Sequence, residues 1–544
     1  MQEDISSERI RDSARRRCGY KDLRPGQEAA VRAVLAGRDT LVVMPTGSGK
    51  SAIYRLAACL LAGPTVVISP LIALQRDQME GIATQRVGGA AVLNSTVPAA
   101  NQSEAFEGLQ EGALEFVFLA PEQFNKQETL EQLCTARPSL FVVDEAHCIS
   151  EWGHSFRPEY LRLGAVIEAL GHPTVLALTA TASPAVREEI ILRLRMRQPR
   201  MIVQGFDRPS IWLGVETFPS ALAKKHALVE HVLAAEKPGI VYVATRKAAE
   251  EVAEALSDQG IRALSYHAGM ATREREQAQM AFMTDEAEVM VATSAFGMGI
   301  DKPNVRFVFH YHLPPSLDAY YQEIGRAGRD GQPARAVLFY RPEDLALRRF
   351  FAQSGRVNVP QVAQVMAAAM ETPGEPRAPA ALRHETVLSE TKVMQSLSGL
   401  AEVGAITFLP TGEVVVDDQD VDAFALAAEA VDVQERRRHL VLSRLAMMRG
   451  YAEGCDCRRI YVLTYFGEDM EQACGFCDIC AAGRPVEQSE SCAPFQLNSW
   501  VRHAEWGRGL VTRYEREHVL VMFETVGEKR LAVEVVVAQG LLEP

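Results

Sequence analysis

Short apolar runs alternate with longer amphipathic segments along about the first 340 residues of the chain. A first series of these runs covers 41–44, 66–68, 116–119, 140–143 and 175–178. A second series covers 240–243, 289–292, 305–309 and 336–339. Almost wholly apolar strands separated by helices are typical of parallel sheets covered on both faces. The pattern therefore predicts two α/β lobes, over 1–205 and 206–345, with ligand-binding loops at the carboxyl ends of the strands.

The pattern changes after Arg341, and a Pro-rich stretch at 372–379 marks a linker. Ser389 is placed to cap a helix that carries three apolar residues on one face, namely Val393, Leu397 and Leu400. Two short apolar runs follow at 406–409 and 414–416, on either side of a Pro-Thr-Gly turn. This order predicts a winged-helix-like insertion over 353–430, although any small α+β insertion gives the same pattern.

The rest of the chain divides into three short parts. A helical stretch at about 433–451 leads into a cysteine cluster, which predicts a helical metal-binding module over 431–483. A polar linker at 484–494 follows, and the apolar alternation beyond it predicts a small all-β unit over 495–544. This last unit is too short to be an enzyme domain.

Composition limits the class of protein. The 544 residues suggest roughly three or four domains, and a hydrophobic content of 47% is enough for buried cores. The first four residues lack a basic and an apolar region, and we find no apolar run of about twenty residues, so we expect neither secretion nor membrane insertion. Ten cysteines in so long a chain do not form a disulfide framework, which favours the reducing cytoplasm and, in a bacterium, the nucleoid.

The net charge of −13 argues against a surface that is positive overall. Contacts with nucleic acid must then come from local basic clusters. One such cluster comprises Arg436, Arg437, Arg438, Arg444 and Arg449. The acidic balance alone does not exclude DNA as a ligand.

The apolar run at 41–44 leads into the sequence Pro-Thr-Gly-Ser-Gly-Lys-Ser at 45–51, before a predicted helix. Glycines let backbone N–H groups surround phosphate oxygens, Lys50 reaches the β and γ phosphates, and the Ser51 hydroxyl is placed to hold Mg²⁺. Met44 occupies the first glycine position of the usual eight-residue pattern. The candidate nucleotide-binding residues are Thr46, Gly47, Ser48, Gly49, Lys50 and Ser51.

Two further segments carry groups for phosphoanhydride hydrolysis. Asp144 and Glu145 follow the apolar run at 140–143, where Asp144 would hold Mg²⁺ and Glu145 would polarise the attacking water. In the second lobe, a helix predicted through Asp330 would bring Gln322, Arg326 and Arg329 to one face. An arginine supplied across a cleft stabilises charge on the γ phosphate. A solvated charge run is the alternative for that segment taken alone.

With these three sites, the chain resembles the superfamily 2 helicases, and more closely the RecQ family, over about 8–350 and 433–482. The resemblance implies two RecA-like lobes and an ATP-driven DNA helicase that travels 3′-to-5′ in repair and recombination. Gly19-Tyr20 and the segment from Arg24 to Gln27 match the family's adenine-reading motif. Tyr20 would then stack on the base and Gln27 would read its edge, with Arg24 in the same motif.

Four more segments follow in family order, at 69–74, 119–122, 178–182 and 292–302. Their strand-end hydroxyls and backbone amides suit the phosphates of a single strand tracked across both lobes. Thr179 and Thr181 would link the ATP state to the grip on this strand.

The segment at 148–160 is similar to the family's aromatic-rich loop. Trp152 and Phe156 would stack on bases, while His154 and Arg157 would report DNA occupancy to the ATP site. A structural aromatic cluster is the alternative interpretation of this loop.

Cys457, Cys474, Cys477 and Cys480 have the spacing C-x16-C-x2-C-x2-C. Four thiolates held by tight turns favour a tetrahedral structural Zn²⁺ without an open position. Cys455 is a competing first ligand, but Arg458-Arg459 and the segment 465–468 match the RecQ pattern and favour Cys457.

The layout departs from the familiar RecQ order. About 80 residues precede the zinc module after the motor and about 60 follow it, so the winged helix that usually follows zinc lacks its place. The segment 501–511 resembles the Tudor-like barrel at the end of some superfamily 1 repair helicases. That likeness favours a protein-interaction module for RNA polymerase or a repair protein, with a passive cap as the alternative. For the whole chain, the alternatives are an RNA helicase, a duplex translocase and an ATPase scaffold.

Overall fold

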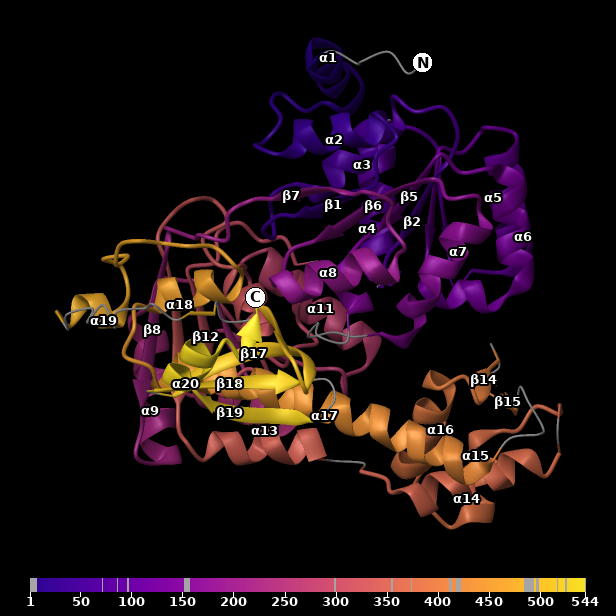
Figure 1. Cartoon of the computed structure of the whole chain (residues 1–544). Coiled ribbons are helices and arrows are strands. Elements are labelled where there is room, and N and C mark those ends of the chain that lie inside the picture. Colours follow the sequence, from indigo (N-terminus) through magenta and orange to yellow (C-terminus); the bar gives the residue numbers. More distant parts are fainter. Residues whose placement is uncertain are drawn as a thin grey trace.

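The computed structural model describes residues 7–70, 72–85, 87–94, 97–150, 157–297, 300–353, 356–372, 374–409, 413–416, 422–483, 494–495, 499–515, 517–523 and 526–543. Figure 1 shows the first lobe at the top, the second lobe below it, the insertion at the lower right and the C-terminal sheet in yellow. Within the described residues, no helix is long and apolar enough to cross a membrane.

The first lobe is built on a seven-stranded parallel sheet in the order β3-β4-β2-β5-β6-β1-β7. Its strands are β1 (Thr40–Val43), β2 (Thr65–Ile68), β3 (Ala90–Leu93), β4 (Phe116–Leu119), β5 (Leu140–Val143), β6 (Thr174–Thr179) and β7 (Arg200–Val203). Its α-helices are α1 (Ser7–Cys18), α2 (Gln27–Leu35), α3 (Lys50–Ala58), α4 (Ile72–Gln85), α5 (Ala99–Gln110), α6 (Gln127–Ala136), α7 (Leu163–Ala169) and α8 (Pro184–Arg193). Three short 3-10 helices cover Pro121–Asn125, Ala146–Ile149 and Pro158–Arg162.

Strand β1 shows why the strands of this sheet are apolar at nearly every position. Leu41 and Val43 pack into one hydrophobic core, whereas Val42 between them packs into another. Successive side chains of a strand point to opposite faces, so a strand covered by helices on both faces buries every residue.

The second lobe has a six-stranded parallel sheet in the order β10-β11-β9-β12-β13-β8. Its strands are β8 (Ile211–Thr217), β9 (Gly239–Tyr242), β10 (Ala263–Tyr266), β11 (Val289–Ala292), β12 (Phe307–His310) and β13 (Ala334–Tyr340). Its helices are α9 (Ala221–Ala234), α10 (Arg246–Ser257), α11 (Thr272–Met283), α12 (Leu317–Ile324) and α13 (Asp344–Gln353). The two parallel sheets confirm the predicted α/β fold of the motor.

The insertion has a core of its own, formed by helices α14 (Val359–Met370), α15 (Pro379–Thr386) and α16 (Glu390–Glu402) and an antiparallel hairpin of β14 (Ile406–Phe408) and β15 (Val414–Val416). The Ser389 hydroxyl caps α16 by accepting a hydrogen bond from the amide of Lys392, at 3.4 Å. The helix and the hairpin are both present as predicted, and the turn at 410–412 lies outside the described residues.

One helix, α17 (Ala423–Glu453), joins the insertion to the zinc module. Its 31 residues correspond to a length of about 46 Å. Asp422 caps it with hydrogen bonds from the amides of Phe424 and Ala425. The helix is continuous across residue 430, where we expected the insertion to end, so the two modules share a rigid element. Helices α18 (Arg458–Tyr465) and α19 (Asp478–Ala481) complete the zinc module.

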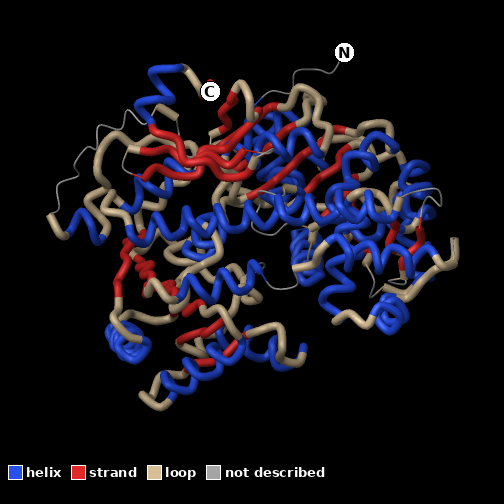
Figure 2. Tube along the Cα trace, turned by 60° about the horizontal axis from the view of Figure 1, so that its bottom comes forward, coloured by secondary structure: helices blue, strands red, loops and turns tan. Residues whose placement is uncertain are grey.

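The tail is an antiparallel half-barrel sheet in the order β19-β18-β17-β16-β20, which agrees with the predicted small all-β unit. Its elements are β16 (Trp500–His503), β17 (Gly507–Glu515), β18 (His518–Phe523), β19 (Gly527–Ala532), α20 (Val533–Gln539) and β20 (Leu542–Glu543). Strands β17 and β19 pack against α17, and Figure 2 shows the sheet lying across this long helix. Arg508 forms an ion pair with Glu188 of α8, so the tail also contacts the first lobe.

Candidate active site and zinc centre

The phosphate loop connects β1 to α3. Gly47 and Gly49 have φ angles of +78° and +79°, a left-handed conformation that favours glycine. Gly49 immediately precedes α3, so the unpaired N–H groups of the first helical turn face the loop. The Lys50 ammonium donates to the carbonyl of Met44 at 3.1 Å, and burial lowers the pKa of Lys50. The Ser51 hydroxyl accepts a hydrogen bond from Gln78 Nε2 at 3.0 Å.

The residues of the predicted adenine motif lie against this loop. Gln27 is buried, and its Nε2 donates to the carbonyls of Ser48 and Gly49 at 3.0 and 2.9 Å. The Arg24 guanidinium donates to the carbonyl of Gly47. Tyr20 and Arg24 line a cavity of about 810 Å³ between α1 and α2, whereas the Gln27 amide holds the loop itself.

The paired carboxylates lie at the end of β5, beside the loop. Glu145 has a φ of +49°, an unfavourable angle for a residue other than glycine. Burial, and then the neighbouring charge of Glu145, raise the pKa of Asp144 to about 7, while the Lys50 charge opposes this shift. A cation beside Asp144 would favour its charged form, as expected of a group that holds a metal ion.

A chain of polar contacts joins these carboxylates to the end of β6. His147 Nδ1 lies 3.3 Å from Glu145 Oε2 and 2.9 Å from Thr179 Oγ1. The Thr179 hydroxyl donates to the carbonyl of Thr181 at 3.1 Å and accepts from the Thr181 amide at 3.3 Å. A ring that carries its proton on Nδ1 fits both contacts of His147. The predicted catalytic and strand-gripping segments are thus linked through Glu145, which is partly buried, and through the buried side chains of His147 and Thr179.

The second lobe faces the loop through Arg329. Its Cδ lies 3.5 Å from the position that a Cβ on Gly47 would take. Arg329 Nη1 pairs with Asp301 Oδ1 at 2.6 Å and donates to the carbonyl of Ile300 at 2.9 Å. Burial and the charge of Arg326 lower the pKa of Arg329. This arginine therefore contacts the phosphate loop from the second lobe.

The predicted helix through Asp330 was wrong, because α12 ends at Ile324. Gly325 ends the helix, and Gly328 has a φ of +59°. As a result, the three residues do not share one helical face. Gln322 and Arg326 line a cavity of about 270 Å³ at the ends of β9, β11 and β12, and Arg326 donates to the carbonyl of Gly297.

Arg208 is a site residue that the sequence did not reveal. It lies in the connector between β7 and β8, where its Nη2 donates to the carbonyls of Thr46 at 3.0 Å and Gly325 at 3.5 Å. It therefore ties the phosphate loop to the second lobe. A lone arginine in a connector offers no spacing or motif by which it could have been found.

Several buried polar atoms in the predicted ATP-binding and DNA-binding segments have no hydrogen-bond partner among the described residues. Ser48 Oγ in the first lobe and Arg329 Nη2 in the second lobe are two of them. Ser69 Oγ and Thr181 Oγ1 are two more, in segments predicted to face a DNA strand. Because buried polar groups are normally hydrogen-bonded, these atoms fit a cleft that receives a polar ligand such as a nucleotide.

The predicted aromatic loop falls mainly outside the described residues, which exclude Trp152, His154 and Phe156. Arg157 follows directly, and its Nη1 donates to the carbonyl of Pro70 at 2.9 Å. The end of this loop therefore contacts the segment after β2, which was predicted to face a DNA strand.

The sulfurs of the four predicted zinc ligands, Cys457, Cys474, Cys477 and Cys480, all lie within 4.8 Å of one another. A tetrahedron with Zn–S bonds of 2.3 Å requires sulfurs about 3.8 Å apart. The Cys474 and Cys480 sulfurs are 3.9 Å apart, which fits. Cys455 is exposed and outside this group, so the structure brings Cys457, and not Cys455, together with the other three cysteines.

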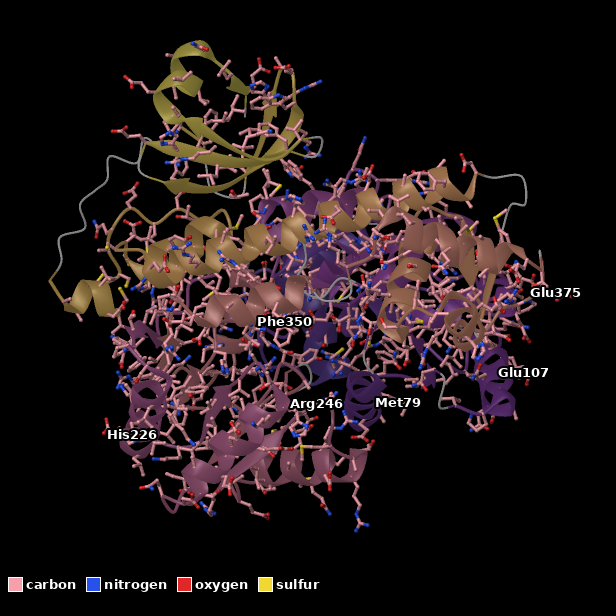
Figure 3. The ribbon with its side chains drawn as sticks, turned by 90° about the horizontal axis from the view of Figure 1, so that it is seen from below. Met79, Glu107, His226, Arg246, Phe350 and Glu375 are labelled. Atoms are coloured by element: carbon pink, nitrogen blue, oxygen red, sulfur yellow. The ribbon has the colours of Figure 1, made fainter. Side chains whose placement is uncertain are left out.

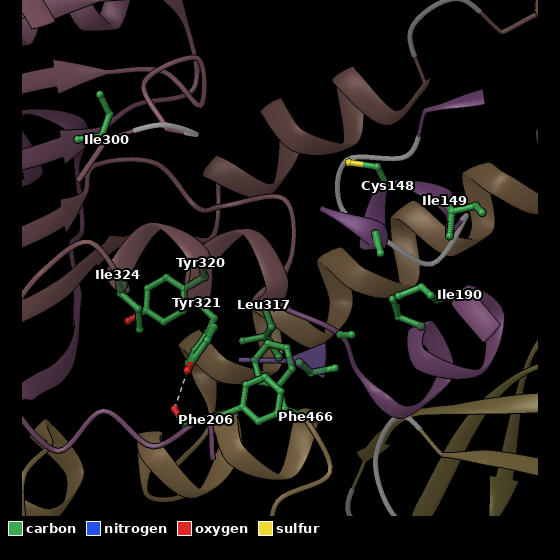
Figure 4. Packing of buried hydrophobic residues seen from close by; sticks show 14 of the residues in the cluster. Cys148, Ile149, Ile190, Phe206, Ile300, Leu317, Tyr320, Tyr321, Ile324 and Phe466 are labelled. Atoms are coloured by element: carbon green, nitrogen blue, oxygen red, sulfur yellow. Dashed lines mark hydrogen bonds between the residues drawn. The ribbon is translucent and has the colours of Figure 1, made fainter. Parts of the chain in front are cut away.

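The zinc module packs on both lobes and on the connector between them. Arg459 pairs with Asp207 at 2.6 Å and donates to the carbonyl of Ile211 at 2.7 Å. The ring of Phe466 stacks on Phe206, with centroids 4.4 Å apart. Figure 4 shows these two rings beside Tyr321, whose hydroxyl donates to the carbonyl of Phe206.

Three family models match the chain in order. They are the DEAD/DEAH box helicase over 24–190, the helicase conserved C-terminal domain over 223–331 and the RecQ zinc-binding region over 418–481. The chain is 36% identical over 464 residues to the ATP-dependent DNA helicase RecQ of Pasteurella multocida, a match that covers 85% of this chain and 60% of that protein. It is 32% identical over 499 residues to the ATP-dependent DNA helicase RecQ of Bacillus subtilis, covering 91% and 71%.

The chain thus spans about 60% of the length of the first of these relatives. Among solved structures, the DUF1998 helicase MrfA bound to DNA matches with a TM-score of 0.53 and 16% identity, over 78% of this chain and 64% of that one. At this identity the likeness shows the fold alone.

Proposed function

Because this chain belongs to the RecQ family of helicases, we propose that it uses ATP to move along single-stranded DNA and to unwind duplex DNA. Family membership favours 3′-to-5′ travel and a role in repair and recombination. Such an enzyme would work in the cytoplasm, at the nucleoid of a bacterial cell.

The observation that carries this proposal is the composite site between the lobes. Arg329 from the second lobe faces Gly47 of the phosphate loop, and Arg208 joins the carbonyls of Thr46 and Gly325. A nucleotide bound on the loop would therefore contact both lobes at once, so its hydrolysis would change how they are held together.

Each side chain at the cleft has a role in the proposed reaction. Lys50 would contact the β and γ phosphates, and Ser51 and Asp144 are the residues that would hold Mg²⁺. When bound, Mg²⁺ neutralises charge on the phosphates. Glu145 would orient and polarise the attacking water, and Arg329 would stabilise the charge that develops on the transferred group.

The nucleotide state would reach the DNA through the polar chain from Glu145 to Thr181. His147 contacts Glu145 and Thr179 together, so movement of Glu145 during hydrolysis alters the position of the Thr179 hydroxyl. Thr179 in turn holds the backbone of Thr181, in a segment that would grip phosphates of the bound strand.

A labelled duplex with either a 3′ or a 5′ single-stranded tail tests the proposal. We expect unwinding of only the 3′-tailed duplex, with ATP and not with a non-hydrolysable analogue, and no unwinding by Lys50→Ala. DNA-stimulated hydrolysis without strand separation would instead indicate a translocase or a scaffold. Stronger stimulation by RNA than by DNA would indicate an RNA helicase.

We also propose that the tail, residues 495–544, binds a protein partner such as RNA polymerase or a repair protein. Support comes from its half-barrel strand order and from Trp506, which is partly exposed and stacks on His503 with centroids 4.1 Å apart. Purified RNA polymerase should be captured by the full chain and not by a chain that ends at residue 494. Equal capture by both chains would contradict this proposal.

A further inference from the structure

A groove of about 600 Å³ lies between the second lobe, the insertion and α17. Its walls include Arg348 and Phe351 from α13, Met394 and Gln395 from α16, and Arg437 and Arg438 from α17. Figure 3 shows α13, which carries the labelled Phe350, lying alongside the long helix α17. We propose that this groove binds single-stranded DNA that has crossed the second lobe. The proposal rests on the DNA-translocating function proposed above.

The groove has an excess of positive charge in a protein that is acidic overall. Four arginines, Arg348, Arg356, Arg437 and Arg438, line it together with only two carboxylates, Glu402 and Glu435. This leaves a local charge of +2, whereas the whole chain carries −13. A local excess of this sign attracts the phosphates of a nucleic acid.

The two carboxylates position the arginines more than they neutralise them. Glu402 pairs with Arg437. Glu435 is shared, because one oxygen lies 3.0 Å from Arg356 and the other 2.9 Å from Arg438. A single carboxylate between two guanidinium groups fixes their orientation and leaves donors on both for phosphate oxygens.

The remaining wall suits bases. Phe351 of α13 is 42% exposed, and Met394 of α16 is also 42% exposed. Aromatic faces stack on bases of any sequence, and a basic surface that follows the backbone commonly accompanies them in proteins that bind single strands. Phe351 beside Arg348 supplies both features on one helix.

Continuity with the motor identifies the occupant as a strand that has crossed the second lobe. Pro315 and Arg348 line this groove and also the 270 Å³ cavity at the ends of β9, β11 and β12. That cavity contains Ser294 and Gln322, from segments that the family resemblance assigns to strand tracking and to ATP hydrolysis. A strand leaving this cavity past Pro315 would enter the groove directly.

Binding of labelled oligothymidylates of two lengths, measured by fluorescence anisotropy at several salt concentrations, tests the proposal. A strand of about ten nucleotides would occupy the lobes, and one of about twenty-five would also reach the groove. We expect Arg356→Ala, Arg438→Ala and Phe351→Ala each to weaken binding of the long strand by about three- to tenfold. The two arginine variants should also reduce the salt slope by about 0.7 for each lost phosphate contact.

Arg383→Ala is the matched control. Arg383 lies on α15 of the same insertion, outside the groove, with 56% side-chain exposure and a carboxylate partner, Glu390. Arg356 is similar, with 65% exposure and Glu435 as its partner. The control should bind both strands as the unaltered chain does. Thermal melting identifies any variant that fails to fold. Arg356 is the most exposed of the three groove arginines that pair with a carboxylate, so we expect Arg356→Ala to fold and to provide the test even if another variant does not.

The outcomes separate this proposal from the proposed function. Unaltered affinity of the folded groove variants for the long strand, or an equal loss for both lengths, would overturn the groove as a DNA site. If single-stranded DNA of neither length stimulated ATP hydrolysis by the unaltered chain, the proposed helicase function itself would be contradicted.

Discussion

Replacing Cys477 with serine should remove zinc and release the zinc module from the second lobe. Cys477 is fully buried, and its backbone bridges to Leu213 of β8. The next residue, Asp478, accepts hydrogen bonds from the amide of Val215 at 3.1 Å and from Arg458 Nε at 3.1 Å. The four sulfurs hold this turn in place, so loss of one ligand would affect contacts between the module and the lobe.

The size of the effect follows from these contacts. A hydrogen bond to a charged group contributes about 1.5–3 kcal/mol, and this is the contribution of the Val215 bond, which joins the module to the lobe. The contacts between Arg458 and Asp478 lie within the module and hold the turn against α18. Free thiols would not replace the metal. Burial raises the pKa of Cys474, and it raises the pKa of Cys480 to about 11, so without zinc these groups would be neutral and would not attract one another. The lobes keep their own cores, so we expect local opening rather than global unfolding.

Zinc content by atomic emission and hydrogen exchange by mass spectrometry would test this. Cys477→Ser should lack zinc and lose protection in 457–483 and along β8, while α3 and β1 retain theirs. Cys455→Ser is the control, because Cys455 is exposed and outside the ligand group, and it should match the unaltered chain in both measurements. Stoichiometric zinc in Cys477→Ser, or zinc loss in Cys455→Ser, would refute the assignment of ligands.

Three further substitutions test the roles assigned at the cleft. Glu145→Gln should lower kcat for ATP at least about a hundredfold with little change in nucleotide affinity, and a parallel loss of binding would argue against a role in orienting water. Arg329→Ala should lower kcat about a thousandfold or more. Arg329→Lys should restore only part of this loss, since lysine lacks the planar guanidinium group that donates several hydrogen bonds at once. Normal turnover in either variant would exclude Arg329 as the arginine that acts on the nucleotide from the second lobe. Thr179→Val removes one buried hydroxyl, so basal hydrolysis should persist while stimulation by single-stranded DNA falls, and unchanged stimulation would show that the contact between His147 and Thr179 does not carry the coupling.

The sequence identified the inner strands of both sheets and missed the edges. In the first lobe the predicted runs correspond to β1, β2, β4, β5 and β6, whereas β3 and β7 are the two edge strands. In the second lobe β9, β11, β12 and β13 were predicted, whereas β10 and β8 lie at the edges. An inner strand of a covered parallel sheet is apolar throughout, but an edge strand is partly exposed. Three of the four residues of β7 are exposed, for example, so its pattern does not stand out.

Site residues were predictable where neighbours in sequence do the chemistry together. The phosphate loop, the pair Asp144 and Glu145, and the C-x2-C turns are local patterns of this kind. Arg208 was missed because its role depends on two carbonyls, of Thr46 and Gly325, that are far apart in the sequence. The separation of Arg326 from Arg329 was also not predictable from helical spacing, since Gly325 ends the helix between Gln322 and both arginines.

The position of the zinc module explains how the insertion would move when the two lobes move relative to each other. Arg187 of α8, in the first lobe, donates to the carbonyl of Phe466 at 2.7 Å, and Glu468 accepts from the amide of Phe206 in the connector at 2.6 Å. On the other side, the Tyr451 hydroxyl at the end of α17 is hydrogen-bonded to that of Tyr320 in the second lobe at 2.9 Å.

Helix α17 therefore ends in a module that contacts both lobes and begins in the core of the insertion, where Ala427 and Ala430 are buried. A helix of about 46 Å that is anchored at both ends turns as one body. Any change in the angle between α8 and the second lobe would then shift the insertion and the groove beside it relative to the cleft. Opening and closing of the ATP site would in this way reach the groove, whose walls come from the insertion and α17 as well as from the second lobe.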